Sequence, residues 1–154
     1  MAEVELPLDS HGFLRRQCPH CQREFKWHHG PVGELPNDAP EVNEYHCPYC
    51  GGAADFDQWW TEEQVDMFRA EAFAEAGPVI EESLRSALEG VNSSGIITAS
   101  VELERQVPPP PLDERDDMVA VASPCHGYEP VKVLESWTGD LHCLVCGSTF
   151  NVLR

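Results

Sequence analysis

The chain has 154 residues and a formal net charge of −17 with its histidines neutral, and 42% of its residues are hydrophobic. That length suits one domain or two small modules. Its apolar runs are too short for a transmembrane helix, and its first residues lack the basic start and apolar stretch of a secretory signal. We therefore expect a soluble, cytoplasmic protein that does not bind membranes.

The acidic residues are concentrated in the middle of the chain. Residues 1–53 carry a net charge of −4, residues 54–117 carry −12 and residues 118–154 carry −1. An acidic excess of this size disfavours non-specific binding to nucleic acid or to an anionic membrane. The simplest interpretation of the acidic middle is a solvated helix face that keeps the protein soluble.

The first segment, residues 1–57, contains two Cys-x-x-Cys pairs and a spacer between them that is rich in glycine and proline. We expect this spacer to be mostly loop. A helix is then predicted near Thr61, because Thr61 and Gln64 have the spacing of a capping box. The preceding pair, Trp59 and Trp60, is expected to anchor that helix to the N-terminal segment.

The second segment, residues 58–106, is predicted to form two helices and a strand. Apolar residues recur at helical spacing after Thr61. The pair Gly77-Pro78 is expected to end the first helix and to start the second. Residues 97–104 then alternate between apolar and polar side chains, which is typical of a half-buried strand.

Four consecutive prolines, Pro108 to Pro111, lie in an acidic linker over residues 107–117. They predict a stiff polyproline II spacer, since proline cannot donate a hydrogen bond to a sheet. A docking site for a proline-recognition domain is the alternative. The last segment, residues 118–154, is predicted to contain short strands at 118–122, 131–134 and 149–153.

The strongest functional signal is a set of four cysteines near the N-terminus. Two Cys-x-x-Cys pairs, separated by 25 residues, each deliver two thiolates from one tight turn, which suits tetrahedral coordination of zinc. Two glycines after the second pair allow the backbone to turn back with its amides facing sulfur. The predicted ligands of this Zn²⁺ ion are Cys18, Cys21, Cys47 and Cys50.

This pattern resembles the zinc-ribbon family over about residues 16–55. The resemblance implies two cysteine knuckles at the ends of short antiparallel hairpins and a structural metal ion. An iron centre of the rubredoxin type has similar spacing, and knuckle spacing alone does not separate iron from zinc. A thioredoxin-type redox pair is disfavoured, because that motif uses a single Cys-x-x-Cys at the start of a helix. Cytosolic cysteines are kept reduced, which favours metal over disulfide.

A second signal is the sequence HCxxCG, which occurs at residues 46–51 and again at 142–147. The C-terminal copy contributes two cysteines, and Cys125 stands alone upstream of them. His126 is the first candidate for a fourth ligand and His142 is the second. We therefore predict a second Zn²⁺ site from Cys125, His126, Cys143 and Cys146.

The C-terminal part thus resembles a second, atypical zinc ribbon over about residues 120–154, which we expect to pack against the first. Two alternatives stay open for it. The ribbon has lost its metal and is held by packing alone, or the three cysteines bind zinc and leave its fourth position open. An open position is the one route to a metal-dependent hydrolase in this chain.

Basic and aromatic residues surround the first cysteine knuckle. They would balance the negative charge that four thiolates leave around a zinc ion. The alternative is a contact with nucleic acid or with a protein partner, in which an aromatic ring stacks on a base. These residues are Arg15, Arg16, Arg23, Lys26 and Trp27.

The predicted fold class is α+β, with small zinc-ribbon modules at both ends and an acidic helical middle. The sequence contains no phosphate-binding loop, HExxH or G-x-S-x-G motif. We predict a non-enzymatic protein-interaction module, an accessory subunit or adaptor, with one or two structural zinc ions. Its acidity favours a partner with a basic surface. A nucleic-acid-binding ribbon is the alternative, and a hydrolase is less favoured.

Overall fold

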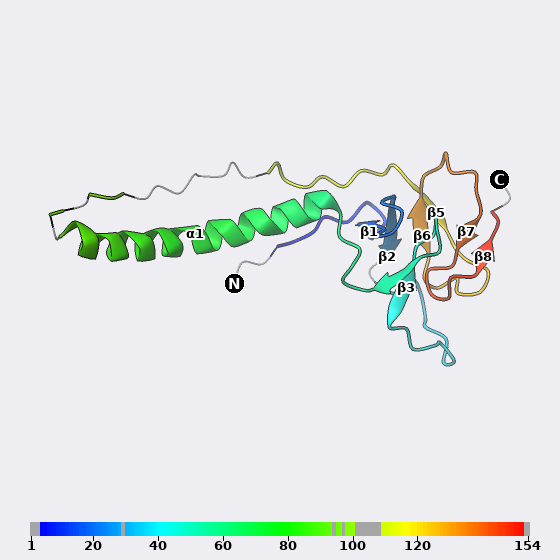
Figure 1. Cartoon of the computed structure of the whole chain (residues 1–154). Coiled ribbons are helices and arrows are strands. Elements are labelled where there is room, and N and C mark those ends of the chain that lie inside the picture. Colours follow the sequence, from blue (N-terminus) through cyan, green and yellow to red (C-terminus); the bar gives the residue numbers. More distant parts are fainter. Residues whose placement is uncertain (1–3, 29, 94, 97, 101–108, 153–154) are drawn as a thin grey trace. The chain divides into compact units, whose positions relative to one another are not determined.

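The computed structural model describes residues 4–28, 30–93, 95–96, 98–100 and 109–152 (Figure 1). Within these residues it mixes one helix with short strands, in agreement with the α+β class. The helix is α1 (Glu62–Asn92). The strands are β1 (Phe13–Gln17), β2 (Glu24–His28), β3 (Glu44–His46), β4 (Ala53–Asp55), β5 (Val119–Val121), β6 (Val131–Val133), β7 (Leu141–His142) and β8 (Thr149–Phe150).

The described residues divide into two compact units. The ribbon unit is drawn from Leu6–Glu62 and Leu112–Arg154, and the helical unit from Met1–Glu5 and Glu63–Pro111. The two cysteine-bearing segments, which the sequence presents as separate modules, therefore belong to one unit.

A four-stranded antiparallel sheet joins the two halves of the ribbon unit. Its strand order is β1-β2-β6-β5, so each outer hairpin comes from a different cysteine-bearing segment. The two hairpins meet where Lys26 pairs with Lys132 and Trp27 pairs with Val131. Two smaller hairpins, β3-β4 and β7-β8, complete the unit. This arrangement agrees with the expectation that the two ribbons pack together.

Aromatic side chains form much of the core of the ribbon unit. The side chain of Trp59 is fully buried, and its ring meets the rings of Phe25 and Trp27 edge-on, with centroids 5.6 and 6.1 Å apart. The backbone N–H of Gln17 also donates to the carbonyl of Trp59 at 2.9 Å. Trp59, which lies three residues before the start of α1, is thus fixed in the ribbon core.

The middle of the chain forms one helix where the sequence predicts two. α1 begins directly after Thr61 and runs through Gly77 and Pro78 to Asn92. A proline inside a helix removes one hydrogen bond and costs about 3 kcal/mol, but its fixed φ is compatible with the helix. Gly77 does not adopt the left-handed backbone that ends helices. Gly95 does so, with a φ of 73°, three residues after α1.

The other expected elements have mixed outcomes. The three C-terminal strands are confirmed as β5, β6 and β8, each shorter than its predicted range. The strand predicted at 97–104 and the start of the proline run lie largely outside the described residues. No helix in the described part of the chain is both long and apolar enough to cross a membrane.

Candidate metal centre

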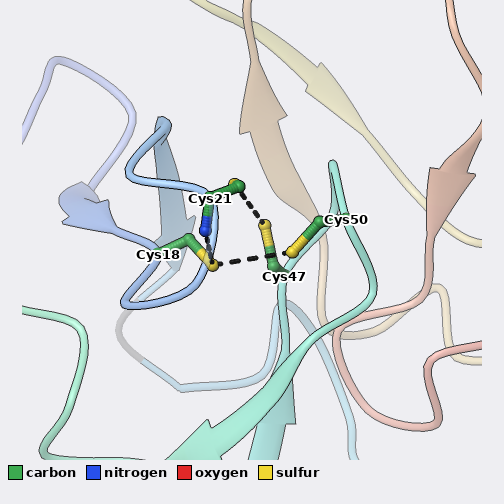
Figure 2. A group of neighbouring side chains, drawn as sticks. All are labelled: Cys18, Cys21, Cys47 and Cys50. Atoms are coloured by element: carbon green, nitrogen blue, oxygen red, sulfur yellow. Dashed lines mark hydrogen bonds between the residues drawn. The ribbon is translucent and has the colours of Figure 1, made fainter.

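Four cysteines at the ends of the N-terminal hairpins form the first cluster, defined as Cys18, Cys21, Cys47 and Cys50 (Figure 2). Cys18 follows β1 and Cys47 follows β3, and each begins a tight turn. In the second turn the N–H of Gly51 donates to the carbonyl of Cys47 at 2.9 Å. The φ of Gly51 is 73°, a conformation that glycine adopts without strain.

Two sulfur–sulfur distances in the first cluster match those of a tetrahedral zinc site. The sulfur atoms of Cys18 and Cys50 are 3.7 Å apart, and those of Cys21 and Cys47 are 3.8 Å apart. A tetrahedron with zinc–sulfur bonds of about 2.3 Å places its sulfur atoms about 3.8 Å apart. A disulfide would need about 2.05 Å, and all seven cysteines are free.

Backbone amides point at the sulfur atoms of the first cluster. The N–H groups of His20 and Cys21 donate to the sulfur of Cys18 at 3.3 and 3.4 Å, and the N–H of Tyr49 donates to that of Cys47 at 3.4 Å. Burial nevertheless raises the pKa of the Cys18 and Cys47 thiols. A metal cation between the sulfur atoms would offset this cost of ionising the two thiols.

The second cluster contains Cys125, His126, Cys143 and Cys146, all within 4.8 Å of one another at their donor atoms. The sulfur atoms of Cys125 and Cys146 are 3.5 Å apart, and Nδ1 of His126 lies 3.4 Å from the sulfur of Cys143. Burial opposes ionisation of Cys146, yet the hydroxyl and amide of Ser148 lower the pKa of this thiol to about 6. The structure thus brings together the four donors that the sequence assigns to a second site.

Sequence reasoning did not single out Ser123, which contacts the second cluster. This buried hydroxyl donates to the sulfur of Cys143 at 3.1 Å and accepts the N–H of His126 at 3.1 Å. Cys18 accepts the N–H of Cys21 in the same way, three residues on. The sequence does contain a sign of this correspondence. Residues 123–126 read SPCH and residues 18–21 read CPHC, so a proline is the second residue of both stretches. Within its knuckle Ser123 therefore accepts the backbone hydrogen bond that Cys18 accepts in the first. The sulfur of Cys125 contacts that of Cys146 as the sulfur of Cys18 contacts that of Cys50.

The two HCxxCG knuckles contact each other reciprocally. The N–H of His46 donates to the carbonyl of Leu144 at 2.9 Å, and the N–H of His142 donates to the carbonyl of Pro48 at 2.9 Å. Each donor is the first residue of its knuckle, and each acceptor is the third residue of the other. This is the pattern of a two-fold contact. His142, the second candidate for a ligand, thus faces the other knuckle.

The same contact explains the glycine at the end of each repeat. A Cβ atom on Gly51 would lie 2.7 Å from Cδ2 of His142, and one on Gly147 would lie 2.7 Å from Cδ2 of His46. Both glycines also have a positive φ. The histidine of each knuckle therefore requires glycine in the other, and the repeat HCxxCG serves packing as well as metal binding.

Most of the basic and aromatic residues predicted to contact nucleic acid or a partner are buried, so they do not form a basic patch on the surface. Arg15 is buried and forms ion pairs with Glu24 at 3.0 Å, Glu114 at 3.0 Å and Asp117 at 2.6 Å. Burial alone would lower the pKa of Arg15, but the three carboxylates raise it above its usual range. The carboxylates that hold Arg15 come mainly from the acidic segment before β5, about 100 residues away in the chain.

Arg16 and Trp27 are also buried within the ribbon unit. The Arg16 guanidinium lies between the rings of Trp27 and Trp60, 4.4 and 4.5 Å from their centroids. Burial lowers the pKa of Arg16 to about 10. Arg23 alone of the five residues is exposed, and its guanidinium lies 5.0 Å from the centroid of the Trp137 ring.

Lys26, the remaining basic candidate, has no exposed side-chain surface and belongs to a buried ionic network. Its Nζ lies 3.3 Å from Oδ2 of Asp9, and Nζ of Lys132 lies 2.6 Å from the same oxygen. A third group of possible ligands, Asp9, His11 and Asp116, lies here. The Lys132 ammonium lies 2.8 Å from Nδ1 of His11 and 2.6 Å from Asp9, so a cationic side chain already contacts two of these three donors.

Comparisons with protein-family models, curated proteins and solved structures give no match for this chain. The resemblance to zinc ribbons therefore rests on the spacing of the cysteines and on the geometry of the two clusters. Both clusters are compatible with a bound metal ion.

Proposed function

We propose that this chain is a non-enzymatic protein-interaction module whose ribbon unit is held together by two structural zinc ions. The observation that carries the proposal is the spacing of the donor atoms, 3.7 and 3.8 Å in the first cluster and 3.4 and 3.5 Å in the second. Tetrahedral zinc with sulfur and nitrogen ligands requires distances of about this size.

The donor sets favour a structural role for the metal. Four protein ligands leave no position for the water or substrate that a catalytic zinc binds. In the second cluster His126 supplies the fourth donor, at the position that a hydrolase would keep open. The imidazole also favours zinc over a rubredoxin-type iron, which is held by sulfur alone. Cysteines that must stay reduced for this purpose suit the cytoplasm.

The acidic face of α1 supports a partner with a basic surface. α1 carries eight acidic and two basic residues. We define the acidic ridge as Glu71, Glu75, Glu82 and Glu89, which recur at spacings of four and seven residues and share one face of the helix. Such a ridge would attract and orient a complementary basic surface. Nucleic-acid binding through residues 15–27 gains no such support, because four of the five side chains concerned are buried.

Metal analysis by inductively coupled plasma mass spectrometry tests the first half of the proposal. We expect two zinc ions per chain in the native protein and one in each of the variants Cys47→Ser and Cys143→Ser. Native protein with a single zinc that Cys143→Ser leaves unchanged would contradict a structural metal in the second cluster. Iron in place of zinc would contradict the assigned cofactor.

Calorimetry with a lysine-rich peptide tests the second half. We expect binding that weakens with salt and is lost in the variant Glu71→Lys/Glu82→Lys/Glu89→Lys. The matched control is Glu34→Lys/Asp38→Lys/Glu41→Lys, which changes the net charge equally in an exposed loop of the ribbon unit. Equal loss in both variants would show attraction by net charge alone and contradict a role for the ridge.

A further inference from the structure

A row of apolar and small residues runs along α1 on the face away from the acidic ridge. Its members follow one another at alternating spacings of three and four residues, the repeat of a coiled-coil seam. We call this row the apolar seam, and it consists of Ala70, Phe73, Gly77, Ile80, Leu84 and Ala87. Its three large side chains are exposed in the described chain, Phe73 to 38%, Ile80 to 47% and Leu84 to 39%.

A helix of this composition needs a partner for its apolar face. Helices gain most of their stability in proteins by packing an amphipathic face, and isolated ones are marginal in water. The pair Gly77-Pro78 weakens α1 further, since glycine costs about 1 kcal/mol and proline about 3 kcal/mol in a helix interior. Exposed apolar side chains in a continuous row mark a surface that another element covers.

We propose that the apolar seam is covered by the same seam of a second copy of this chain. The charges of α1 support this occupant over a charged partner. The positions that flank the seam are Arg69, Ala74, Ala76, Glu81, Ser83, Leu88 and Gly90. Glu81 is the single acidic residue among them and pairs with Arg85 of its own helix at 2.8 Å. Arg69 lies 3.8 Å from Asp66 of its own helix.

Two copies can therefore meet without bringing like charges into contact, although each chain has a net charge of −17. The acidic ridges point away from the contact on both sides. The seam also alternates in size, because three large and three small side chains share its six positions. Large residues of one helix can then enter the spaces over small residues of the other, as knobs enter holes. The seam spans 18 residues, or about 27 Å of helix.

The dependence on salt distinguishes this contact between two copies from the binding of a basic partner. The contact between two copies is apolar, and the long-range repulsion between two acidic chains opposes it. Added salt screens that repulsion, so the dimer should become tighter. The acidic ridge should bind a basic surface less tightly under the same change. Self-association and partner binding thus respond to salt in opposite directions. An experiment can therefore contradict one of the two proposals without contradicting the other.

Sedimentation equilibrium of the full-length chain over a concentration series tests the proposal. We expect a mass of two 17.2 kDa chains that dissociates on dilution and persists to lower concentration as salt is raised. Ile80→Asp should raise the dissociation constant by more than about tenfold, because it places an unpaired carboxylate in an apolar contact. Leu84→Asp, one turn further along, should have the same effect.

Val79→Asp is the matched control. Val79 precedes Ile80 in the same helix and is exposed to 66%, but it lies off the seam, so its replacement should leave the dimer intact. Circular dichroism should report the same helix content in Val79→Asp and Ile80→Asp. A native chain that is monomeric at every concentration would overturn the proposal, and so would equal dissociation by the two substitutions.

Discussion

The two clusters of the ribbon unit share one framework and differ in one knuckle. Each takes two cysteines from an HCxxCG knuckle, and these two knuckles hold each other by reciprocal hydrogen bonds. The first cluster is completed by a regular Cys-x-x-Cys knuckle. The second is completed by adjacent residues, Cys125 and His126. There Ser123 accepts the backbone hydrogen bond that Cys18 accepts in the first. The knuckle that repeats is the one that contacts its counterpart, so packing constrains this knuckle in addition to metal coordination.

Metal removal should have the largest effect on the stability of the ribbon unit. The two clusters should also lose their metal ions at different rates. The first cluster offers four thiolates, whereas the second offers three and exposes both Cys125 and Cys146. We expect a chelator to take metal from the second cluster first. Loss of both ions should unfold the ribbon unit, since a structural zinc contributes on the order of 10 kcal/mol to folding.

This order of release is measurable with a colour-forming chelator and tryptophan fluorescence recorded together. Trp59 is fully buried, so unfolding should change its emission. Cys125→Ser should abolish the fast phase of release and Cys21→Ser the slow phase. Release of all metal with unchanged fluorescence would show that packing alone holds the ribbon unit.

Substitution of Gly51 or Gly147, the glycines that end the two HCxxCG knuckles, should have the next largest effect on stability. Gly51→Ala and Gly147→Ala each strain a positive φ and push a Cβ atom into a histidine of the other knuckle. We expect each to lower the free energy of unfolding by about 2 kcal/mol, measured by urea denaturation of the zinc-loaded protein. Similar losses at the two sites would support the reciprocal contact.

A control separates the clash from the backbone strain. Gly33 has a positive φ of 82°, but nothing lies within 4 Å of an added Cβ atom. Gly33→Ala should therefore cost less than Gly51→Ala, and the double variant Gly51→Ala/His142→Ala should recover part of the loss. Equal costs for Gly33→Ala and Gly51→Ala would remove His142 from the explanation.

The smallest expected effect concerns Ser123, which has no counterpart hydroxyl in the first cluster. Ser123→Ala removes the hydrogen bond to the sulfur of Cys143. We expect metal affinity at the second cluster to fall by about tenfold, as for other groups that orient a ligand, while the first cluster is unaffected. Chelator competition measures both affinities. Ser136→Ala, an exposed serine in the same segment, should change neither.

The proposed ligands could be recognised from sequence because metal knuckles are local motifs. Two donors within four residues define each knuckle, and the repeat of HCxxCG links the two ends of the chain. The continuous helix was harder to predict, because proline and glycine are strong breakers when read locally. Their cost is offset over the length of α1, which continues for 14 residues after Pro78.

The ion-pair partners of the basic residues could not be predicted from their neighbours in the chain. Arg15 and Lys26 lie beside the first knuckle in sequence, which favoured a role in charge balance or in binding. Their actual partners include Glu114, which lies in the linker after the proline run. The pairing of β2 with β6 helps to bring that linker back to the first hairpin. Such long-range contacts leave no periodic signal in the sequence.

The most direct test of the central claim, two closed metal sites with different donors, is X-ray absorption at the zinc edge of the native protein. We predict two zinc ions that share seven sulfur neighbours and one nitrogen neighbour, each ion being four-coordinate. A single zinc with sulfur neighbours alone would contradict a metal site in the second cluster. An added oxygen neighbour would show an open coordination position and contradict the structural role.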